Sequence, residues 1–271
     1  MPPPTLVSSP TLTLTPEPLT RESFAPFGTA IIPPLPRTAT TPPTPLSSHP
    51  KHALIPAPVA ANQLSALKYS PISPLTNNYA KCPSGIPAEA RMSMFSCFPR
   101  QLRTTTSSST EGRAKAKVPR QVFDVTILER HPYTTQTFTP LGLSDSASNA
   151  ETYYLVIVAP SLTGQVEKAV AESGESVEVR DPPDLSRLKV FRARGGQAVT
   201  YGVGTWHAPM VVVGEQRVDF VVAQFANGVG EEDCQEVCFG RSEGDGEGIV
   251  VDLTEMTENG KKEEARAGAK L

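Results

Sequence analysis

The chain has 271 residues, 38% of them hydrophobic, which allows one sizeable core with much of the chain outside it. Its formal net charge is −3, and basic residues form no stripe interleaved with aromatic ones, which argues against nucleic acid as a partner. No apolar run approaches the roughly 20 residues that span a bilayer, and the Pro-rich N-terminus lacks the pattern of a signal peptide, so no membrane partner is expected.

The N-terminal third is predicted to hold little regular structure. Residues 1–16 are expected to form a flexible N-terminus. Thr20, followed by Glu22 and Ser23, indicates the start of a short helix that turns Phe24 toward a core. The Pro-, Thr- and Ser-rich segment that follows is predicted to be a loop.

Short β-patterned runs dominate the middle of the chain. They are rich in Val, Ile, Phe, Tyr and Thr, and Gly, Pro, Asp and Ser bound them. No comparable helical periodicity appears. The pattern predicts an all-β fold, a cupin-type double-stranded β-helix or jelly-roll barrel with short flanking helices and disordered insertions. The predicted strands are 91–98, 121–131, 135–139, 153–159, 188–193, 197–201, 206–213 and 217–226.

A single catalytic domain is predicted over residues 17–240, followed by a flexible C-terminal tail at 241–271. Low-complexity or charged insertions interrupt this domain at four places. They lie near 33–50, 103–118, 143–152 and 162–184.

The last three residues, Ala269, Lys270 and Leu271, resemble the peroxisomal address Ser-Lys-Leu. A polar tail precedes them, so an import receptor is expected to reach them. The sequence therefore predicts a peroxisomal or a cytoplasmic location, and a chance tripeptide on a frayed tail is the alternative.

Two of the four histidines stand at strand ends. His49 and His52 lie in or beside the Pro-rich segment and are expected to be solvated. Strict alternation along 123–131 places Phe123, Val125, Ile127, Glu129 and His131 on one inward face. Burying Glu129 without a partner would cost on the order of several kcal/mol, so an ion, a cationic group or a polar substrate is expected beside it.

The spacing around these residues resembles the two cupin motifs. Gly196, Gly204 and His207 fit the second motif, with Gly202 where Pro is usual. In the first motif, Glu129, His131 and Gln136 occupy the places of the usual His, His and Glu.

Imidazole and carboxylate groups suit nickel, zinc or manganese, and the predicted metal set is Glu129, His131, Gln136 and His207. Because Gln is a poor ligand, the sequence leaves open whether any metal is bound. The alternative is that both histidines are core residues with satisfied hydrogen bonds.

Three stretches resemble the ureidoglycolate lyase family: LERHPYTTQTFTPLG at 128–142, YGVGTWHAPM at 201–210 and VDFVVAQF at 218–225. The resemblance implies a cupin-like homodimer of purine and allantoin breakdown that cleaves ureidoglycolate to glyoxylate and urea. It implies a catalytic set of Glu129, His131 and His207. It also implies substrate-binding residues, which are Asn77, Asn78, Gln136, Tyr201 and Trp206.

One departure concerns the substrate carboxylate. Members of the family often carry an Arg where this chain has Ser96, so Arg91, Arg100 or a metal is expected to take that role. His131 or Glu129 would be the base and His207 the acid, or the reverse. Trp206 would close the pocket, and the alternative, more usual for a Trp in a strand, is that it packs in the core.

Three other functions are compatible with the same residues. One is a ureidoglycolate amidohydrolase that releases ammonia, which normally needs a metal-activated water and a richer His/Asp set. Another is a non-catalytic, cupin-like sensor of a small carboxylate. A cupin isomerase or dioxygenase usually keeps the full His-x-His and Glu set, which Glu129 and Gln136 break.

Overall fold

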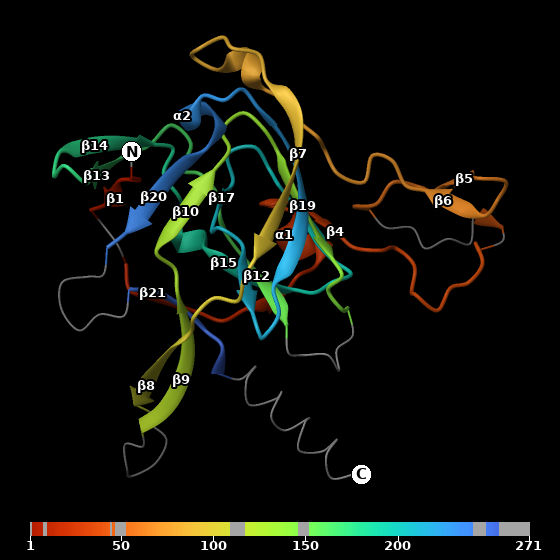
Figure 1. Cartoon of the computed structure of the whole chain (residues 1–271), viewed down its shortest axis with the longest axis horizontal. Helices are drawn as coiled ribbons and strands as arrows, with labels where there is room; N and C mark the ends of the chain where they lie inside the picture. The colour runs from red at the N-terminus through yellow and green to blue at the C-terminus, as the bar shows by residue number, and fades with distance from the viewer. Residues whose placement is uncertain are drawn as a thin grey trace.

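The computed structural model describes residues 2–7, 10–43, 45–46, 53–108, 117–145, 152–240 and 248–254. Over these ranges the chain is nearly all β, which confirms the predicted fold class and is consistent with a cupin-like fold (Figure 1). No helix in the described ranges is both long and apolar enough to cross a membrane.

The largest sheet is ten-stranded, and its β10, β17 and β12 are adjacent. The path through this sheet is β14 (Ser176–Arg180), β13 (Val166–Val170), β1 (Thr5–Leu6), β20 (Gln235–Phe239), β10 (Ile127–Arg130), β17 (Trp206–His207), β12 (Tyr153–Ala159), β15 (Lys189–Ala193) and β3 (Glu17–Pro18), with β18 (Val211–Val213) also paired to β12.

A five-stranded sheet faces part of this large sheet. Its order is β4 (Gly28–Ile31), β16 (Ala198–Tyr201), β11 (Gln136–Leu141), β19 (Val218–Ala226) and β7 (Glu89–Cys97), all antiparallel. β7 is therefore an edge strand, and it lies over β19 at the front of Figure 1.

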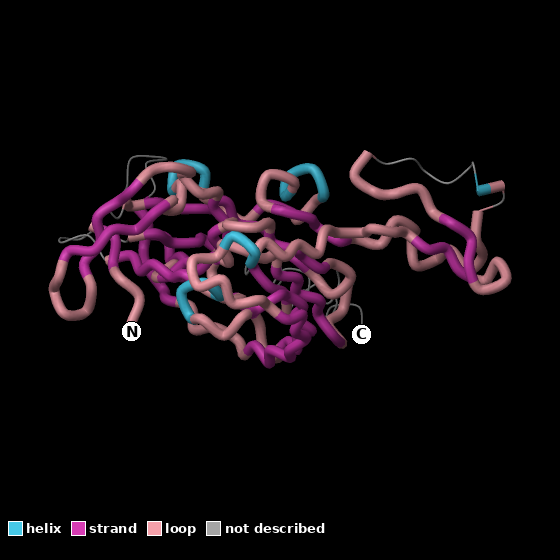
Figure 2. The backbone as a smooth tube through the Cα atoms, turned by 90° about the horizontal axis from the view of Figure 1, so that it is seen from above, coloured by secondary structure: helices cyan, strands magenta, loops and turns pink. Residues whose placement is uncertain are grey.

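Two smaller sheets complete the described structure. One has the order β2 (Leu12–Leu14), β21 (Ile249–Asp252), β9 (Lys117–Asp124) and β8 (Arg103–Ser108). The other is the hairpin of β5 (Val59–Ala61) and β6 (Ala66–Lys68). This hairpin lies on an arm that extends away from the main sheets (Figure 2).

The helices are single turns. α1 (Arg21–Phe24) begins where the sequence predicts, because the Thr20 side chain accepts a hydrogen bond from the Ser23 backbone N–H at 3.1 Å. It buries Phe24 completely. α2 (Gly230–Asp233) and the 3-10 helices η2 (Tyr79–Lys81) and η3 (Leu185–Arg187) lie in connections between strands.

The core has two layers because β12 is buried on both faces. Its sequence YYLVIVA is an uninterrupted apolar run, as expected for a strand covered on both sides. Tyr154, Val156 and Val158 pack with residues of the five-stranded sheet such as Phe138 and Phe220 in an inner layer. Tyr153, Leu155 and Ile157 pack in an outer layer on the opposite face of β12.

The strict alternation expected along 123–131 is wrong. β9 and β10 are separated at Val125 and Thr126 because β9 pairs with β8 and β21, whereas β10 pairs with β17 and β20. Phe123 and Val125 consequently share the outer layer with Leu128 and not a face with Glu129.

Regular structure also occurs where the sequence predicts insertions or flexible ends. The segment 162–184 holds the β13–β14 hairpin. Only one face of this hairpin is covered, and the many charged residues on its strands made the alternation of buried and exposed positions hard to recognise in the sequence. The predicted insertion at 103–118 contributes β8 and the start of β9. β1 and β2 lie within residues 1–16, and β21 lies beyond residue 240.

Replacing Val251 tests whether β21 belongs to the core. Val251 is fully buried, so Val251→Ala is expected to lower the free energy of unfolding by about 2 kcal/mol, through lost apolar burial and an unfilled cavity. The measurement is urea denaturation. Val166→Ala, at a half-exposed valine of β13, is the control and should stay within about 0.5 kcal/mol of the wild type. Equal effects of the two changes would contradict the placement of β21.

Candidate functional site

The site is built where β10 and β17 pair. Glu129 of β10 stands directly opposite His207 of β17, and His207 also pairs with Val158 of β12, whose side chain lies in the inner layer. His131 comes two residues after Glu129. One ligand atom from each of Glu129, His131 and His207 lies within 4.8 Å of the others, so the structure brings the predicted catalytic set together.

Backbone carbonyls fix the orientation of both imidazoles. His131 Nδ1 is 2.6 Å from the carbonyl oxygen of Asp233, and His207 Nδ1 is 3.1 Å from that of Thr205. A carbonyl oxygen can only accept a hydrogen bond, so each Nδ1 must carry the hydrogen. Each Nε2 is buried and has no hydrogen-bond partner among the described residues. The two Nε2 atoms are therefore the free acceptors of this site.

The carboxylate of Glu129 adds a third acceptor. Its Oε1 is 3.3 Å from His207 Nε2, and the two imidazole ring centres are 5.4 Å apart. Burial opposes ionisation of Glu129, but the neighbouring His207 and His131 bring the pKa of its carboxyl below the usual value. Burial and the nearby His207 lower the pKa of His131. Three electron-pair donors thus converge. The Cys234 thiol donates only to the other carboxylate oxygen, Glu129 Oε2, over 4.0 Å, so a shared proton or a cation among the three acceptors would stabilise the arrangement.

The donor set also fits a divalent metal ion. Two neutral imidazole nitrogens and one carboxylate oxygen are ligands that nickel, zinc and manganese accept. The Nδ1–H to carbonyl hydrogen bonds are the usual support for metal-binding histidines, because they fix the tautomer and the ring direction. The unpartnered, buried Nε2 atoms are thus placed as ligands would be.

Two of the predicted substrate-binding residues come from the facing sheet. The Tyr201 ring stacks on His207, with ring centres 3.9 Å apart and planes at 12°. Gln136 pairs with Tyr201 across β11 and β16, and its Nε2 donates to Gln224 Oε1 at 2.6 Å. The buried Oε1 of Gln136 has no partner among the described residues. Both residues therefore stand on the side of the five-stranded sheet that faces the three acceptors.

The two predicted asparagines hold a loop. Asn77 Oδ1 accepts from the backbone N–H of Tyr79 at 3.1 Å, and Asn77 forms an isolated antiparallel β-bridge with Thr134. The Asn78 N–H donates to the carbonyl of Tyr133 at 2.7 Å. These contacts fix the 76–81 loop beside the segment after His131.

Trp206 does not lie in the site. Adjacent residues of a strand face opposite sides, so Trp206 points into the outer layer while His207 points inward. Its indole N–H donates to the Asp181 carbonyl at 2.9 Å, and the Arg130 guanidinium stands 4.9 Å above its ring. The expectation that Trp206 closes the pocket is therefore wrong, because its place in the β17 register turns it away.

Sequence patterns missed Asp233 and Gln224. Besides holding His131 through its carbonyl, Asp233 accepts hydrogen bonds at its carboxylate from the Tyr79 hydroxyl at 2.6 Å and from the backbone of Asn227 at 2.8 Å. A backbone carbonyl contact leaves no signal in a sequence. Gln224 did leave one, since it interrupts the apolar inward positions of β19 that Val218, Phe220 and Val222 occupy.

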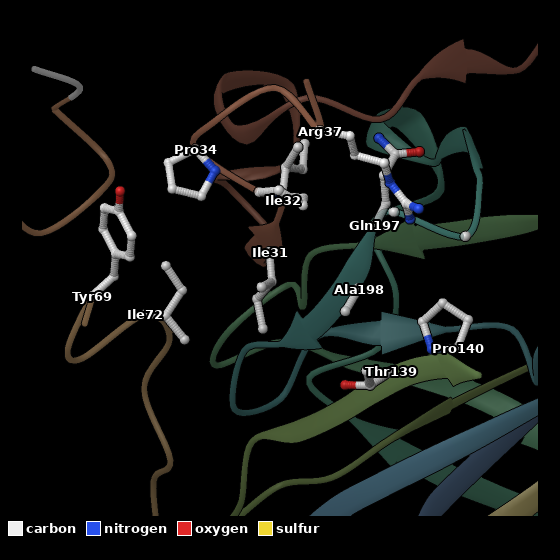
Figure 3. A pocket seen from close by; sticks show the side chains of 13 residues that line it. Ile31, Ile32, Pro34, Arg37, Tyr69, Ile72, Thr139, Pro140, Gln197 and Ala198 are labelled. Atoms are coloured by element: carbon white, nitrogen blue, oxygen red, sulfur yellow. The ribbon is translucent and has the colours of Figure 1, made fainter. Parts of the chain in front are cut away.

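A cavity of about 470 Å³ lies elsewhere on the molecule. Figure 3 shows Ile31, Ala198 and Thr139 on one side of it and Tyr69 and Ile72 of the arm on the other. None of Glu129, His131 and His207 lines it. Its lining is mostly apolar and holds no group of acids and imidazoles, so it is not where the chemistry is expected.

Comparison with known proteins agrees with the resemblance in the sequence. A family model described as ureidoglycolate lyase matches residues 11–243. The chain is 34% identical over 214 residues to the ureidoglycolate lyase of Saccharomyces cerevisiae, which covers 78% of this chain and 85% of that protein. It is also 34% identical over 177 residues to the ureidoglycolate lyase of Schizosaccharomyces pombe, covering 65% of this chain and 75% of that protein.

Replacing Trp206 separates the two faces of β17. Trp206→Phe removes the indole donor and leaves a gap, so the free energy of unfolding is expected to fall by about 1 to 3 kcal/mol. The kcat and KM of the folded variant should stay near those of the wild type, because the side chain does not face the three acceptors. Steady-state kinetics and urea denaturation on one preparation provide the check. A large rise in KM at unchanged stability would contradict this placement.

Proposed function

The chain belongs to the ureidoglycolate lyase family, and from that premise we propose that Glu129, His131 and His207 carry out its reaction. A ureidoglycolate lyase converts ureidoglycolate to glyoxylate and urea, and this is the function of the chain. The observation that most supports the residue assignment is that two buried Nε2 atoms without hydrogen-bond partners lie close to the half-buried carboxylate of Glu129 within the matched region.

The reaction requires one proton acceptor and one proton donor. The reacting carbon of ureidoglycolate carries a hydroxyl, a carboxylate and a urea nitrogen. Breaking the C–N bond requires that the hydroxyl lose its proton and that the departing nitrogen gain one. The O–H electron pair becomes the second bond of the aldehyde carbonyl, and the C–N pair leaves with nitrogen. No water is consumed, so the products are glyoxylate and urea.

His131 is suited to accept the hydroxyl proton. Its lowered pKa keeps the imidazole neutral near pH 7, and its Nδ1–H bond to Asp233 directs the Nε2 lone pair into the site. His207 is suited to donate, since a proton between its Nε2 and Glu129 Oε1 would relieve the contact of two acceptors at 3.3 Å. After release of the products, proton exchange with solvent restores both histidines.

A divalent ion is the second way to stabilise the three acceptors. We propose Glu129, His131 and His207 as its ligands, with the unpartnered Oε1 of Gln136 as a fourth. Bound there, such an ion would supply Lewis acidity that lowers the pKa of the substrate hydroxyl. In that case the Nε2 atoms would hold the ion, and the proton roles would pass to other groups, so metal dependence decides between the two arrangements.

A homodimer is proposed on the basis of the resemblance, and the surface of β7 is compatible with it. Met92 and Met94, on the outward face of this edge strand, are 78% and 59% exposed. Exposed apolar side chains on an edge strand favour pairing with another surface.

A peroxisomal or cytoplasmic location is likewise proposed. It depends on Ala269, Lys270 and Leu271, which lie outside the described residues.

Replacing each histidine tests the assignment. His131→Ala and His207→Ala are expected to lower kcat for glyoxylate release by about a hundredfold or more, because each removes one proton-transfer group. A coupled glyoxylate assay provides the measurement, with urea and ammonia determined in parallel. Arg217→Ala, which breaks a surface ion pair with Asp219, is the control. Near wild-type turnover in both histidine variants, or ammonia in place of urea, would contradict the proposal.

Metal titration tests the second arrangement. After chelation, addition of Zn²⁺, Ni²⁺ or Mn²⁺ is expected to raise the melting temperature, because an ion that binds only the folded chain stabilises it. Glu129→Gln should abolish this rise, as should His207→Ala. Full activity of the chelated protein, with no change in melting temperature on addition of any of the three ions, would contradict the metal-bound arrangement.

A further inference from the structure

We propose that Arg91 binds the substrate carboxylate at the open edge of this site. The inference rests on the proposed function, since it names the group that recognises one end of ureidoglycolate. Its basis is the register of the five-stranded sheet, which aligns Arg91 with the residues that face the histidines.

Four residues form one row across four adjacent strands. Tyr201 of β16 pairs with Gln136 of β11. Gln136 hydrogen-bonds to Gln224 of β19, whose neighbour Ala223 pairs with Thr137 in the same register. Gln224 in turn pairs with Arg91 of β7. Directly opposed residues of antiparallel strands point to the same side of a sheet, so Arg91 faces the side on which Tyr201 stacks against His207.

The contacts of β7 confirm which of its faces points inward. Phe95, four residues after Arg91, meets the inner-layer ring of Phe138 with ring centres 5.7 Å apart. Cys97 packs against the same layer. Met92, between these positions, belongs to the alternate, outward set and is 78% exposed. Because side chains alternate along a strand, Arg91 belongs with Phe95 and Cys97.

Arg91 is also a cation that structural contacts leave available. Among the described residues its guanidinium takes part in no ion pair, hydrogen bond or ring contact, and the residue is exposed at the edge of the sheet. Arg100, the other arginine considered from the sequence, stands 5.7 Å from the ring of Phe123 in the outer layer. Arg130 is held on the reverse face by Trp206 and by the Arg180 carbonyl.

The chemistry of the row fits one end of the substrate. A guanidinium binds a carboxylate through two parallel hydrogen bonds, which fixes orientation as well as charge. Neighbouring strands are about 4.8 Å apart, so Arg91 lies two strand spacings from Gln136, and its extended side chain can span one of them. A carboxylate above Gln224 would therefore place the adjacent carbon toward Gln136 and His131, where the proton transfers are proposed.

The experiment compares Arg91→Gln and Arg91→Lys with Arg100→Gln as the matched control. Losing a charged hydrogen-bond partner is expected to raise KM for ureidoglycolate by about tenfold to a hundredfold in Arg91→Gln, with little change in kcat. Arg91→Lys should recover part of the loss, because it keeps the charge without the bidentate geometry. Arg100→Gln should keep the wild-type KM.

Product inhibition supplies a second measurement, because a merely structural role of Arg91 would not change the inhibition by one product and leave the other unaffected. Arg91→Gln should weaken inhibition by glyoxylate, which carries the carboxylate, and leave inhibition by urea unchanged. An unchanged KM together with unchanged glyoxylate inhibition would overturn the assignment of Arg91. Wild-type protein that releases no glyoxylate and urea would instead overturn the proposed function, so the two failures are distinguishable.

Discussion

Two backbone carbonyls set the character of the site. By accepting from the Nδ1–H groups of His131 and His207, the carbonyls of Asp233 and Thr205 leave both Nε2 atoms as acceptors close to Glu129. If both imidazoles instead carried their hydrogen on Nε2, each would present an N–H donor to the Glu129 carboxylate and satisfy it. The site instead requires a proton or a cation, and that requirement is the basis of every chemical role assigned to it.

The rest of the fold keeps these three acceptors in place. On the reverse face of β10, the buried Arg130 donates to Gln235, Ser161 and the Asp181 carbonyl while it covers Trp206. These contacts tie β10 and β17 to the β14 end of the large sheet. On the loop side, the Tyr79 hydroxyl holds the Asp233 carboxylate, and so its carbonyl stays against His131.

Local chemistry in the sequence was enough to predict the all-β class and the Thr20 helix start, and the resemblance to the two cupin motifs predicted that Glu129, His131 and His207 meet. It was not enough for features that depend on which strands pair. Contrary to the prediction, Phe123 does not share a face with Glu129, because β9 and β10 pair with different strands. Trp206 faces away from the site because it is next to the inward-facing His207 in β17, and neighbouring residues of a strand point to opposite sides. Asp233 acts through a backbone atom, and Arg91 gains its place only from the β7–β19 register. The Asp233 carbonyl contact leaves no pattern in one sequence, and the sequence offered Arg91 only as one of three candidates for the substrate carboxylate.

The most direct test of the central claim is the protonation of the two imidazoles, read from ¹⁵N chemical shifts and long-range ¹H–¹⁵N couplings of the histidine side chains. The account predicts a hydrogen on Nδ1 of both His131 and His207 at neutral pH, whether Nε2 is free, protonated or bound to an ion. An imidazole with its only hydrogen on Nε2 at either position would contradict it, because that ring could not donate to the carbonyl beside it.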